Sequence, residues 1–367
     1  MKKIIAVTSA LAAASCLTMA EIRINEFLSF EGFVDMSYSH SDADINSPDG
    51  SESESDNSFG IDQVEIDWLF NFGKLTAQVD LEYEESGDDT EVEQAFVSYD
   101  LGNGSAVTVG RYESMLGLEA KEPTGLYQYS NAYSIISELA DGSPLPQYAQ
   151  GVKFTKTTDT SFLGLSIQDQ AFGTGVGSLG GSGGDTAPDG TYAIEAAASI
   201  TSGDTTYFIG SVYEDGDDFS EVWFLNGHVS HQTGLWTLGA EVFIGNTELD
   251  FGFGGGAGPG PPNVDLDLTG GLIMANYAYN ECSSVTARVS YVQYDVNLPA
   301  GLGGISNLDV EGLKYTLAHN YALTDNLAII TEISYSDFDI SGSGGGEESG
   351  SIDGDELLGA VEVLFTF

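Results

Sequence analysis

The chain has 367 residues, of which 57 are acidic and 10 are basic, so its formal net charge at pH 7 is −47. This charge repels phosphate backbones and excludes nucleic acid as a default partner. Apolar residues make up 41% of the chain, and 19 Phe, 18 Tyr and 3 Trp argue against disorder. Beyond residues 1–20 no apolar run approaches the roughly 18 residues of a membrane-spanning helix, which excludes a helical membrane protein.

Residues 1–20 have the composition of a secretory signal peptide. Two lysines precede an apolar stretch, which ends in a small-x-small cleavage site at residues 18–20. A lipoprotein signal around Cys16 is the alternative, although a Leu is expected three residues before such a Cys. We therefore expect residues 1–20 to be cleaved and residues 21–367 to form the exported domain, which keeps 8 of the 10 basic residues.

The mature chain alternates apolar and polar residues, which is the period of β-strands. Between residues 75 and 84 the odd positions are Leu, Ala, Val, Leu and Tyr, and the even positions are Thr, Gln, Asp, Glu and Glu. One face of this strand is therefore apolar and the other is polar and largely acidic. Residues 71–74 join it to the preceding strand as a tight hairpin, because Gly73 can take a positive φ.

Sixteen such strands are expected, each of about the 9–11 residues or slightly more that a tilted membrane strand requires. They cover residues 29–39, 60–70, 74–84, 92–101, 105–111, 147–157, 161–170, 191–201, 205–213, 220–231, 235–245, 265–279, 284–296, 309–321, 327–339 and 355–367. Short turns alternate with long Gly-, Asp- and Ser-rich loops, such as 40–58, 173–190, 246–264, 297–308 and 341–354. This alternation indicates an antiparallel barrel with both termini on the short-turn side.

The apolar faces of these strands decide the environment of the barrel. The interior of a sixteen-stranded barrel is too wide for side chains to fill, so an apolar lining would enclose a void. The inverted arrangement places the apolar faces in lipid, where closure pairs every backbone polar group, and leaves the acidic faces to line a water-filled lumen. We therefore predict an all-β, transmembrane antiparallel β-barrel with short periplasmic turns, long extracellular loops and a long third loop.

Two segments resemble a known family. Residues 361–367 (Val-Glu-Val-Leu-Phe-Thr-Phe) resemble the C-terminal signature of bacterial outer-membrane barrels. Residues 110–112 (Gly-Arg-Tyr), 117–120 (Gly-Leu-Glu-Ala) and 122–124 (Glu-Pro-Thr) resemble the segment after the fifth strand of OmpL-like β-barrel porins, within the outer-membrane porin superfamily. The resemblance implies a position among outer-membrane lipids, Phe367 as an assembly signal for the barrel-assembly machinery, and a homotrimer. The basic ladder of phosphate-selective porins and the Pro-Glu-Phe-Gly-Gly-Asp sequence of general porins are absent.

The longest expected connection, residues 112–146, follows the fifth strand and is the third long loop. In general porins the third loop folds inward and narrows the pore, and the resemblance implies the same role here. An external lid is the alternative. The charged residues of this segment are candidates for the constriction: Glu113, Glu119, Lys121, Glu122, Glu138 and Asp141.

Charged residues that alternate with apolar residues along a strand lie on its polar face, which is expected to point into the lumen. The pore-lining candidates are Asp35, Glu65, Asp67, Asp80, Glu82, Glu195, Glu241, Glu332, Glu362, Lys153, Arg288 and Lys314. Rings of charged side chains set ion preference in pores, so this acidic set predicts a preference for cations. For any single residue the alternative is that it only hydrates a wide lumen. The three bases are expected to face the acidic third loop across the lumen.

No catalytic or metal-binding pattern emerges from the sequence. His228 and His231 are three residues apart, which on a strand sends them to opposite faces. Acidic segments such as 51–56 could bind divalent cations, but none has EF-hand spacing, and solvation explains them better. We expect no enzyme and no cofactor. The predicted function is passive diffusion of small hydrophilic solutes and cations; the alternative is a plugged surface barrel whose acidic loops bind a partner or divalent cations.

Overall fold

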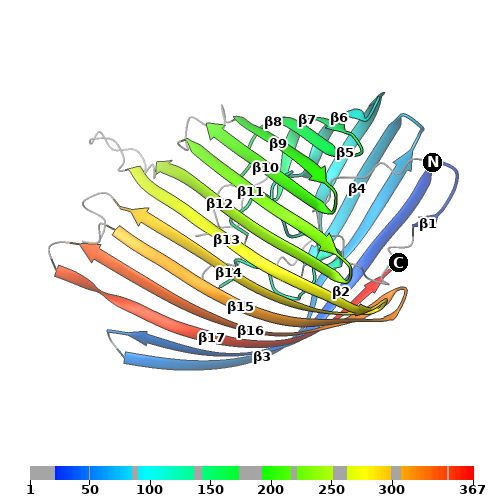
Figure 1. Cartoon of the computed structure of the whole chain (residues 1–367). Coiled ribbons are helices and arrows are strands. Elements are labelled where there is room, and N and C mark those ends of the chain that lie inside the picture. Colours follow the sequence, from blue (N-terminus) through cyan, green and yellow to red (C-terminus); the bar gives the residue numbers. More distant parts are fainter. Residues whose placement is uncertain are drawn as a thin grey trace.

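The computed structural model describes residues 21–48, 50–84, 90–135, 143–172, 192–215, 221–250, 263–298, 307–344 and 347–367. Sixteen strands, β2 to β17, each pair antiparallel with the next, and β17 pairs with β2, so the sheet closes into a barrel (Figure 1). The short strand β1 (Ile22–Arg23) pairs with β2. The expected signal peptide lies outside the described residues.

Each expected strand has its counterpart in the barrel, which confirms the sixteen-stranded antiparallel prediction. The strands are β2 (Leu28–Ser47), β3 (Gly50–Asn71), β4 (Leu75–Glu84), β5 (Thr90–Gly102), β6 (Ser105–Glu113), β7 (Tyr148–Thr157), β8 (Ser161–Gln168), β9 (Tyr192–Ser202), β10 (Thr205–Asp215), β11 (Val222–Thr233), β12 (Trp236–Asp250), β13 (Asn263–Asn280), β14 (Ser283–Asn297), β15 (Asn307–Thr324), β16 (Leu327–Gly344) and β17 (Glu347–Thr366). The β3–β4 hairpin turns where it was expected, and Gly73 has a φ of 82°.

Several strands are longer than expected, and two of the expected loops are wrong. Segment 40–58 is a continued β2–β3 hairpin in which the two strands pair up to Ser47 and Gly50. Most of 341–354 belongs to β16 and β17. The Ser- and Asp-rich composition suggested loops, but serines on β3 hydrogen-bond to polar side chains opposite them on β2, as Ser53 does with Asp44. These pairs stabilise an extended hairpin of polar residues.

The side chains of β8 show which way the faces of the barrel point. Leu163, Leu165 and Ile167 are 54%, 49% and 60% exposed on the outside, whereas the intervening Ser166 is fully buried inside. The same alternation of exposed apolar and buried polar residues recurs in β9, where Ile194 is exposed and Glu195 is buried. The apolar face is therefore the outer one, as a lipid environment requires. Within the described residues no helix is long and apolar enough to cross a membrane.

The C-terminal residue completes the closure of the barrel. The N–H of Phe367 donates to the Gly32 oxygen and the N–H of Gly32 donates to the Phe367 oxygen, both at 2.9 Å. The Phe367 ring lies over Gly32, where a Cβ would leave too little room, and its centroid is 6.3 Å from that of Phe30. The last residue thus joins the two ends of the sheet.

Deleting Phe367 tests this closure. We expect the truncated protein to be translocated normally, because the signal peptide expected at residues 1–20 would act before membrane insertion. We expect it to enter the membrane poorly, because two closing hydrogen bonds and a ring contact are lost. Heat-modifiable migration and membrane fractionation measure insertion. Phe72→Ala, an exposed aromatic in the β3–β4 turn, is the control. Normal membrane yield of the truncated protein would contradict the role given to Phe367.

Candidate functional site

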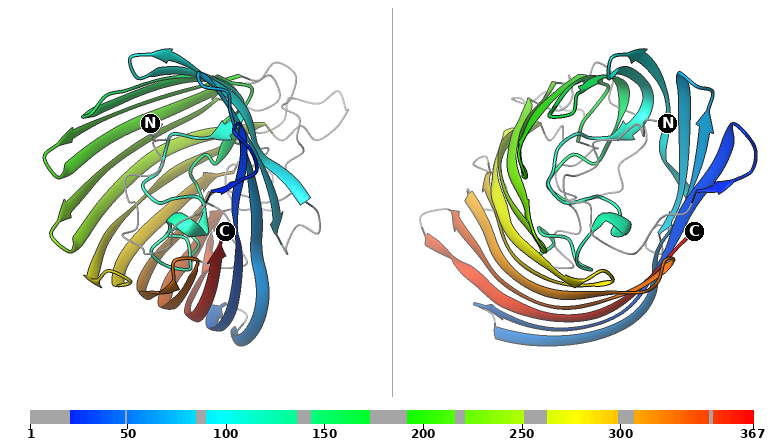
Figure 2. Two further views of the ribbon diagram at one scale, coloured as in Figure 1. Left: turned by 90° about the vertical axis from the view of Figure 1, so that its right-hand side faces the viewer. Right: turned by 45° about the vertical axis from the view of Figure 1, so that its right-hand side comes forward.

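The segment between β6 and β7 lies inside the barrel, as the views in Figure 2 show. We call residues 114–147 the inner loop; the structure describes residues 114–135 and 143–147 of it. Its described residues contain one short 3-10 turn, η2 (Pro123–Gly125). Its hydrogen bonds reach strands on opposite sides of the barrel, from Ser37 on β2 to Glu241 on β12.

Three carboxylates of the inner wall hold the inner loop. All three are at least 95% buried, and each accepts hydrogen bonds from the loop through short, charge-assisted contacts. The backbone contacts are Glu195 Oε1 with the Met115 N–H (2.6 Å), Glu241 Oε1 with the Leu118 N–H (2.8 Å) and Glu332 Oε2 with the Ser130 N–H (3.0 Å). The hydroxyls of Ser114, Tyr133 and Ser130 donate to the same three carboxylates. Residues predicted to line the pore thus bind the loop.

The three predicted inner-wall bases also bind the inner loop or the strand end from which it leaves. Arg288 forms an ion pair with Glu119 at 2.6 Å, and its side chain is fully buried. Lys314 Nζ donates to the Ser134 oxygen at 2.9 Å, and Lys153 Nζ donates to the Glu113 oxygen at 2.9 Å. The expectation that these bases face the loop across an open lumen is therefore wrong, because the loop lies directly against them.

Apolar side chains of the inner loop pack against the inner wall. Leu116, Leu118, Tyr133 and Ile135 are nearly fully buried in a cluster with inward-facing residues of β8–β14 and β16. The wall leaves space for them: a Cβ added at Gly210 would overlap Leu116, and one added at Gly312 would overlap Ile135. The sequence led us to expect a uniformly polar inner surface, and this expectation is wrong. The inner surface has an apolar sector, which the loop covers.

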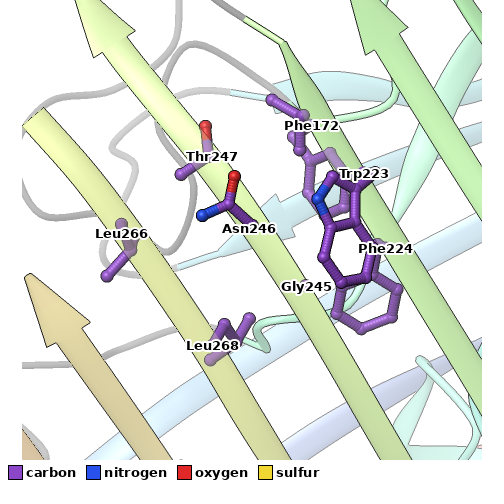
Figure 3. Close-up of a pocket in the computed structure, with 9 residues that line it drawn as sticks. Phe172, Trp223, Phe224, Gly245, Asn246, Thr247, Leu266 and Leu268 are labelled. Carbon is purple, nitrogen blue, oxygen red and sulfur yellow. The ribbon is translucent and has the colours of Figure 1, made fainter. Parts of the chain in front are cut away.

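A shallow pocket on β11, β12 and β13 belongs to this apolar sector. Figure 3 shows its lining, in which Phe172 and Phe224 lie on one side of Asn246 and Thr247, and Leu266 and Leu268 lie on the other. Gly245 makes room for the Phe224 ring, which a Cβ would approach to 2.8 Å. None of the nine residues that line the pocket is ionisable. We assign it to packing.

Lys121 fixes the end of the inner loop. Its Nζ donates to the Pro146 oxygen at 2.7 Å and to the Gln147 oxygen at 3.0 Å. Burial lowers the pKa of this lysine, while the carboxylates around it, Glu113 first among them, raise it. Glu122, the next residue, accepts from Tyr148 at 2.6 Å and from Gln63 on β3 at 3.0 Å. The loop is thus tied both to β7, the strand that follows it, and to β3.

The inner faces of β3, β4 and β5 carry a concentration of carboxylates, which we call the acidic wall. Four of its members are buried: Glu65 and Asp67 on β3, Asp80 on β4 and Glu93 on β5. The fifth, Glu82, lies opposite Glu65. Asp35 on β2 and Glu362 on β17 form a second buried acidic pair beside it. The remaining predicted site residues, Glu138 and Asp141, lie outside the described residues.

Glu93 is the acidic-wall residue that sequence parity missed. Val97, Tyr99 and Leu101 face outward on β5, and strict alternation places Glu93 with them. A β-bulge interrupts the pairing: Gln94 pairs with Asp80 and Val92 pairs with Leu81, which leaves Glu93 unpaired. The bulge turns its side chain inward, as bulges do where they re-aim a residue. The two acidic residues that flank Val92 give the only local sign of this in the sequence.

The two histidines considered in the sequence do lie on opposite faces. His228 is buried inside, with its ring stacked on Phe208 at 4.3 Å between centroids. His231 is paired with Thr205, whose Oγ1 lies 2.9 Å from the histidine Nδ1. The two rings cannot share a metal ion.

Comparison with known proteins agrees with this architecture. A family model described as "Putative beta-barrel porin-2, OmpL-like" matches residues 28–367. The chain belongs to this OmpL-like porin family. Its place is therefore the bacterial outer membrane, in a family of porin-like β-barrel channels. A search of curated protein sequences gives no match.

Solved structures share the fold of this porin at low sequence identity. OmpT of Vibrio cholerae has 12% identity and a TM-score of 0.59, over 95% of this chain and 100% of that one. The outer-membrane channel DcaP of Acinetobacter baumannii has 12% identity and a TM-score of 0.56, over 93% and 97% of the two chains. An anion-selective porin from Comamonas acidovorans has 14% identity and a TM-score of 0.56, over 93% and 99%.

Replacing Arg288 tests how the inner loop is held. Arg288→Met leaves the Glu119 carboxylate without its cation, and we expect the stability of the porin to fall by about 3–5 kcal/mol. The double variant Arg288→Met, Glu119→Gln should recover part of that loss. Thermal loss of the heat-modifiable form and protease cleavage within residues 114–135 measure the effect. Lys156→Gln, at an exposed lysine of β7, is the control. Equal stability of Arg288→Met and this control would contradict the anchoring role.

Proposed function

We propose that this porin is a water-filled channel through which small hydrophilic solutes and ions diffuse passively, with cations preferred over anions. The inner loop is the constriction. The observation that supports this proposal is that the basic and the acidic side chains of the inner wall have different surroundings. Lys153, Arg288 and Lys314 each contact the inner loop or its attachment to β6, whereas five carboxylates gather on the acidic wall.

The sign of the proposed preference follows from this separation. Positive side chains that bind the loop are covered by it, so their contribution to the potential of the lumen is reduced. The acidic wall, with Glu122 of the loop beside it, leaves a negative potential that concentrates cations and disfavours anions. The proposal includes no covalent chemistry. A trimer, expected from the family resemblance, belongs to the proposal as well; OmpT of Vibrio cholerae has a structure in a trimer form.

A plugged barrel is the second candidate, and one observation favours it. The inner loop crosses the interior: the Tyr129 hydroxyl lies 3.1 Å from Ser37 Oγ on β2, while Leu118 is bound to β12. In this candidate the long acidic hairpins, such as 42–55, would bind a partner or divalent cations outside. The two candidates differ in whether ions pass.

Planar-bilayer recording separates the two candidates. We expect the purified porin to give discrete conductance steps, and deletion of residues 116–136 to raise their size, because the deleted segment fills part of the lumen. As a control, the tip of the β2–β3 hairpin, residues 46–51, is replaced by Asn-Gly; this should leave the step size unchanged. Silence of the full-length protein, with conduction only after loop deletion, would establish the plug instead.

Reversal potentials in a KCl gradient test the preference. We expect cation preference at 0.1 M KCl that fades at 1 M, where the Debye length shrinks from about 10 Å to about 3 Å. Asp67→Asn with Glu82→Gln should bring the K⁺/Cl⁻ permeability ratio closer to one. The control is Asp337→Asn with Asp355→Asn, a facing pair on the outer surface of β16 and β17. Anion preference at 0.1 M would refute the charge argument and leave the barrel assignment intact.

A further inference from the structure

Three carboxylates of the acidic wall converge on one point. Glu65 on β3, Asp80 on β4 and Glu93 on β5 are 3%, 0% and 7% exposed. One oxygen from each lies within 4.8 Å of the others. The strands are neighbours in the sheet, and the bulge at Glu93 brings the third carboxylate next to the other two. Without the bulge this side chain would face lipid.

The hydrogen bonds of this cluster are incomplete. Asp80 Oδ2 accepts from the amides of Gln78 (2.9 Å) and Gln94 (2.8 Å), but the other oxygen, Oδ1, is buried without a donor among the described residues. Glu93 Oε2 and Asp67 Oδ1 are also buried and have no hydrogen-bond donor in the part of the chain that the structure describes. A buried carboxylate oxygen that lacks a donor is costly, and several together repel one another. A bound cation would give these oxygens a partner and would reduce the repulsion between them.

The loop anchors provide a contrast within the same barrel. Glu241 accepts from Leu118 and Asn226 with Oε1 and from Tyr133 with Oε2, so both of its oxygens are satisfied. Both oxygens of Glu332 are paired with Ser130, whose N–H donates to Oε2 and whose hydroxyl donates to Oε1. A buried carboxylate of this protein that serves the loop has both oxygens paired. The acidic-wall cluster departs from that pattern.

We propose that Glu65, Asp80 and Glu93 bind a single divalent cation of the calcium type, with Asp67 beside them. Ca²⁺ takes 6–8 oxygen ligands at about 2.4 Å, so any two oxygens around one ion lie at most about 4.8 Å apart. The three oxygens of the cluster, which lie within 4.8 Å of one another, satisfy this limit. Three carboxylates supply up to six oxygens, and water completes the shell. The site goes beyond the diffusion channel proposed above.

The charge of the surroundings suits a divalent ion. Arg111 Nε donates to the Glu93 backbone oxygen at 2.8 Å, and the charge of Lys121 also acts on Glu93. These two positive charges do not balance the four carboxylates of Glu65, Asp67, Asp80 and Glu93. A bound Ca²⁺ would link β3, β4 and β5 through their side chains and remove two negative charges from the acidic wall.

Calorimetric titration of CaCl₂ into the folded, EDTA-treated porin in detergent tests the site. We expect one saturable Ca²⁺ per chain and a rise in the temperature at which the heat-modifiable form is lost. Asp80→Asn and Glu93→Gln should each weaken binding at least tenfold and remove the Ca²⁺-dependent rise. Without Ca²⁺, Glu93→Gln should be at least as stable as the unaltered protein, because a buried repulsion is relieved. Glu65→Gln serves in place of any variant that does not fold.

The control is Asp337→Asn, which removes an exposed carboxylate from the outer face of β16. It should leave the saturable site intact. Absence of a saturable site, or a site that survives Asp80→Asn and Glu93→Gln, would overturn the proposal. So would many weak sites that diminish equally in the control. Conductance and ion preference are recorded in EDTA, so a failure of the Ca²⁺ site and a failure of the diffusion channel give different results.

Discussion

The closure of the backbone hydrogen-bond network is the constraint on which the structure depends. In lipid no water is available to the backbone, so every strand needs two neighbours, and β17 must return to β2. The paired N–H and oxygen atoms of Phe367 and Gly32 complete this ring. Closure with sixteen strands fixes an interior that side chains of the wall alone cannot fill. In this protein the inner loop occupies part of that interior.

Much of the fold could be predicted, because strand alternation is a local property. The expected strand and turn around Gly73 match the structure, as do the outward Leu75 and the inward Glu195. The continued β2–β3 hairpin could not be predicted from composition, since Ser53 and Asp44 favour turns until they are paired across strands. Parity also fails at a bulge, where one unpaired residue, Glu93, turns to the other face.

The sequence predicted which side chains of the site point inward, but it did not predict which residues they contact. Parity indicates that Glu241 points inward, but its partner, Leu118, is 123 residues away in the chain and no local pattern connects them. The same holds for Arg288 and Glu119, whose ion pair spans 169 residues. The path of the inner loop depends on such distant pairs and on the space left at Gly210, which the sequence does not display as a pattern.

The roles of the buried acids follow from the donors around them, since the residue types are the same throughout. Glu195 accepts hydrogen bonds from Ser114 and Met115 on one oxygen and from Gln168 on the other. Both of its oxygens are therefore paired once the loop is in place. Asp80 receives two amides on one oxygen and none from the described residues on the other. The bases under the loop and the oxygens left unpaired among the described residues are therefore the common basis of the proposed cation preference and of the proposed Ca²⁺ site.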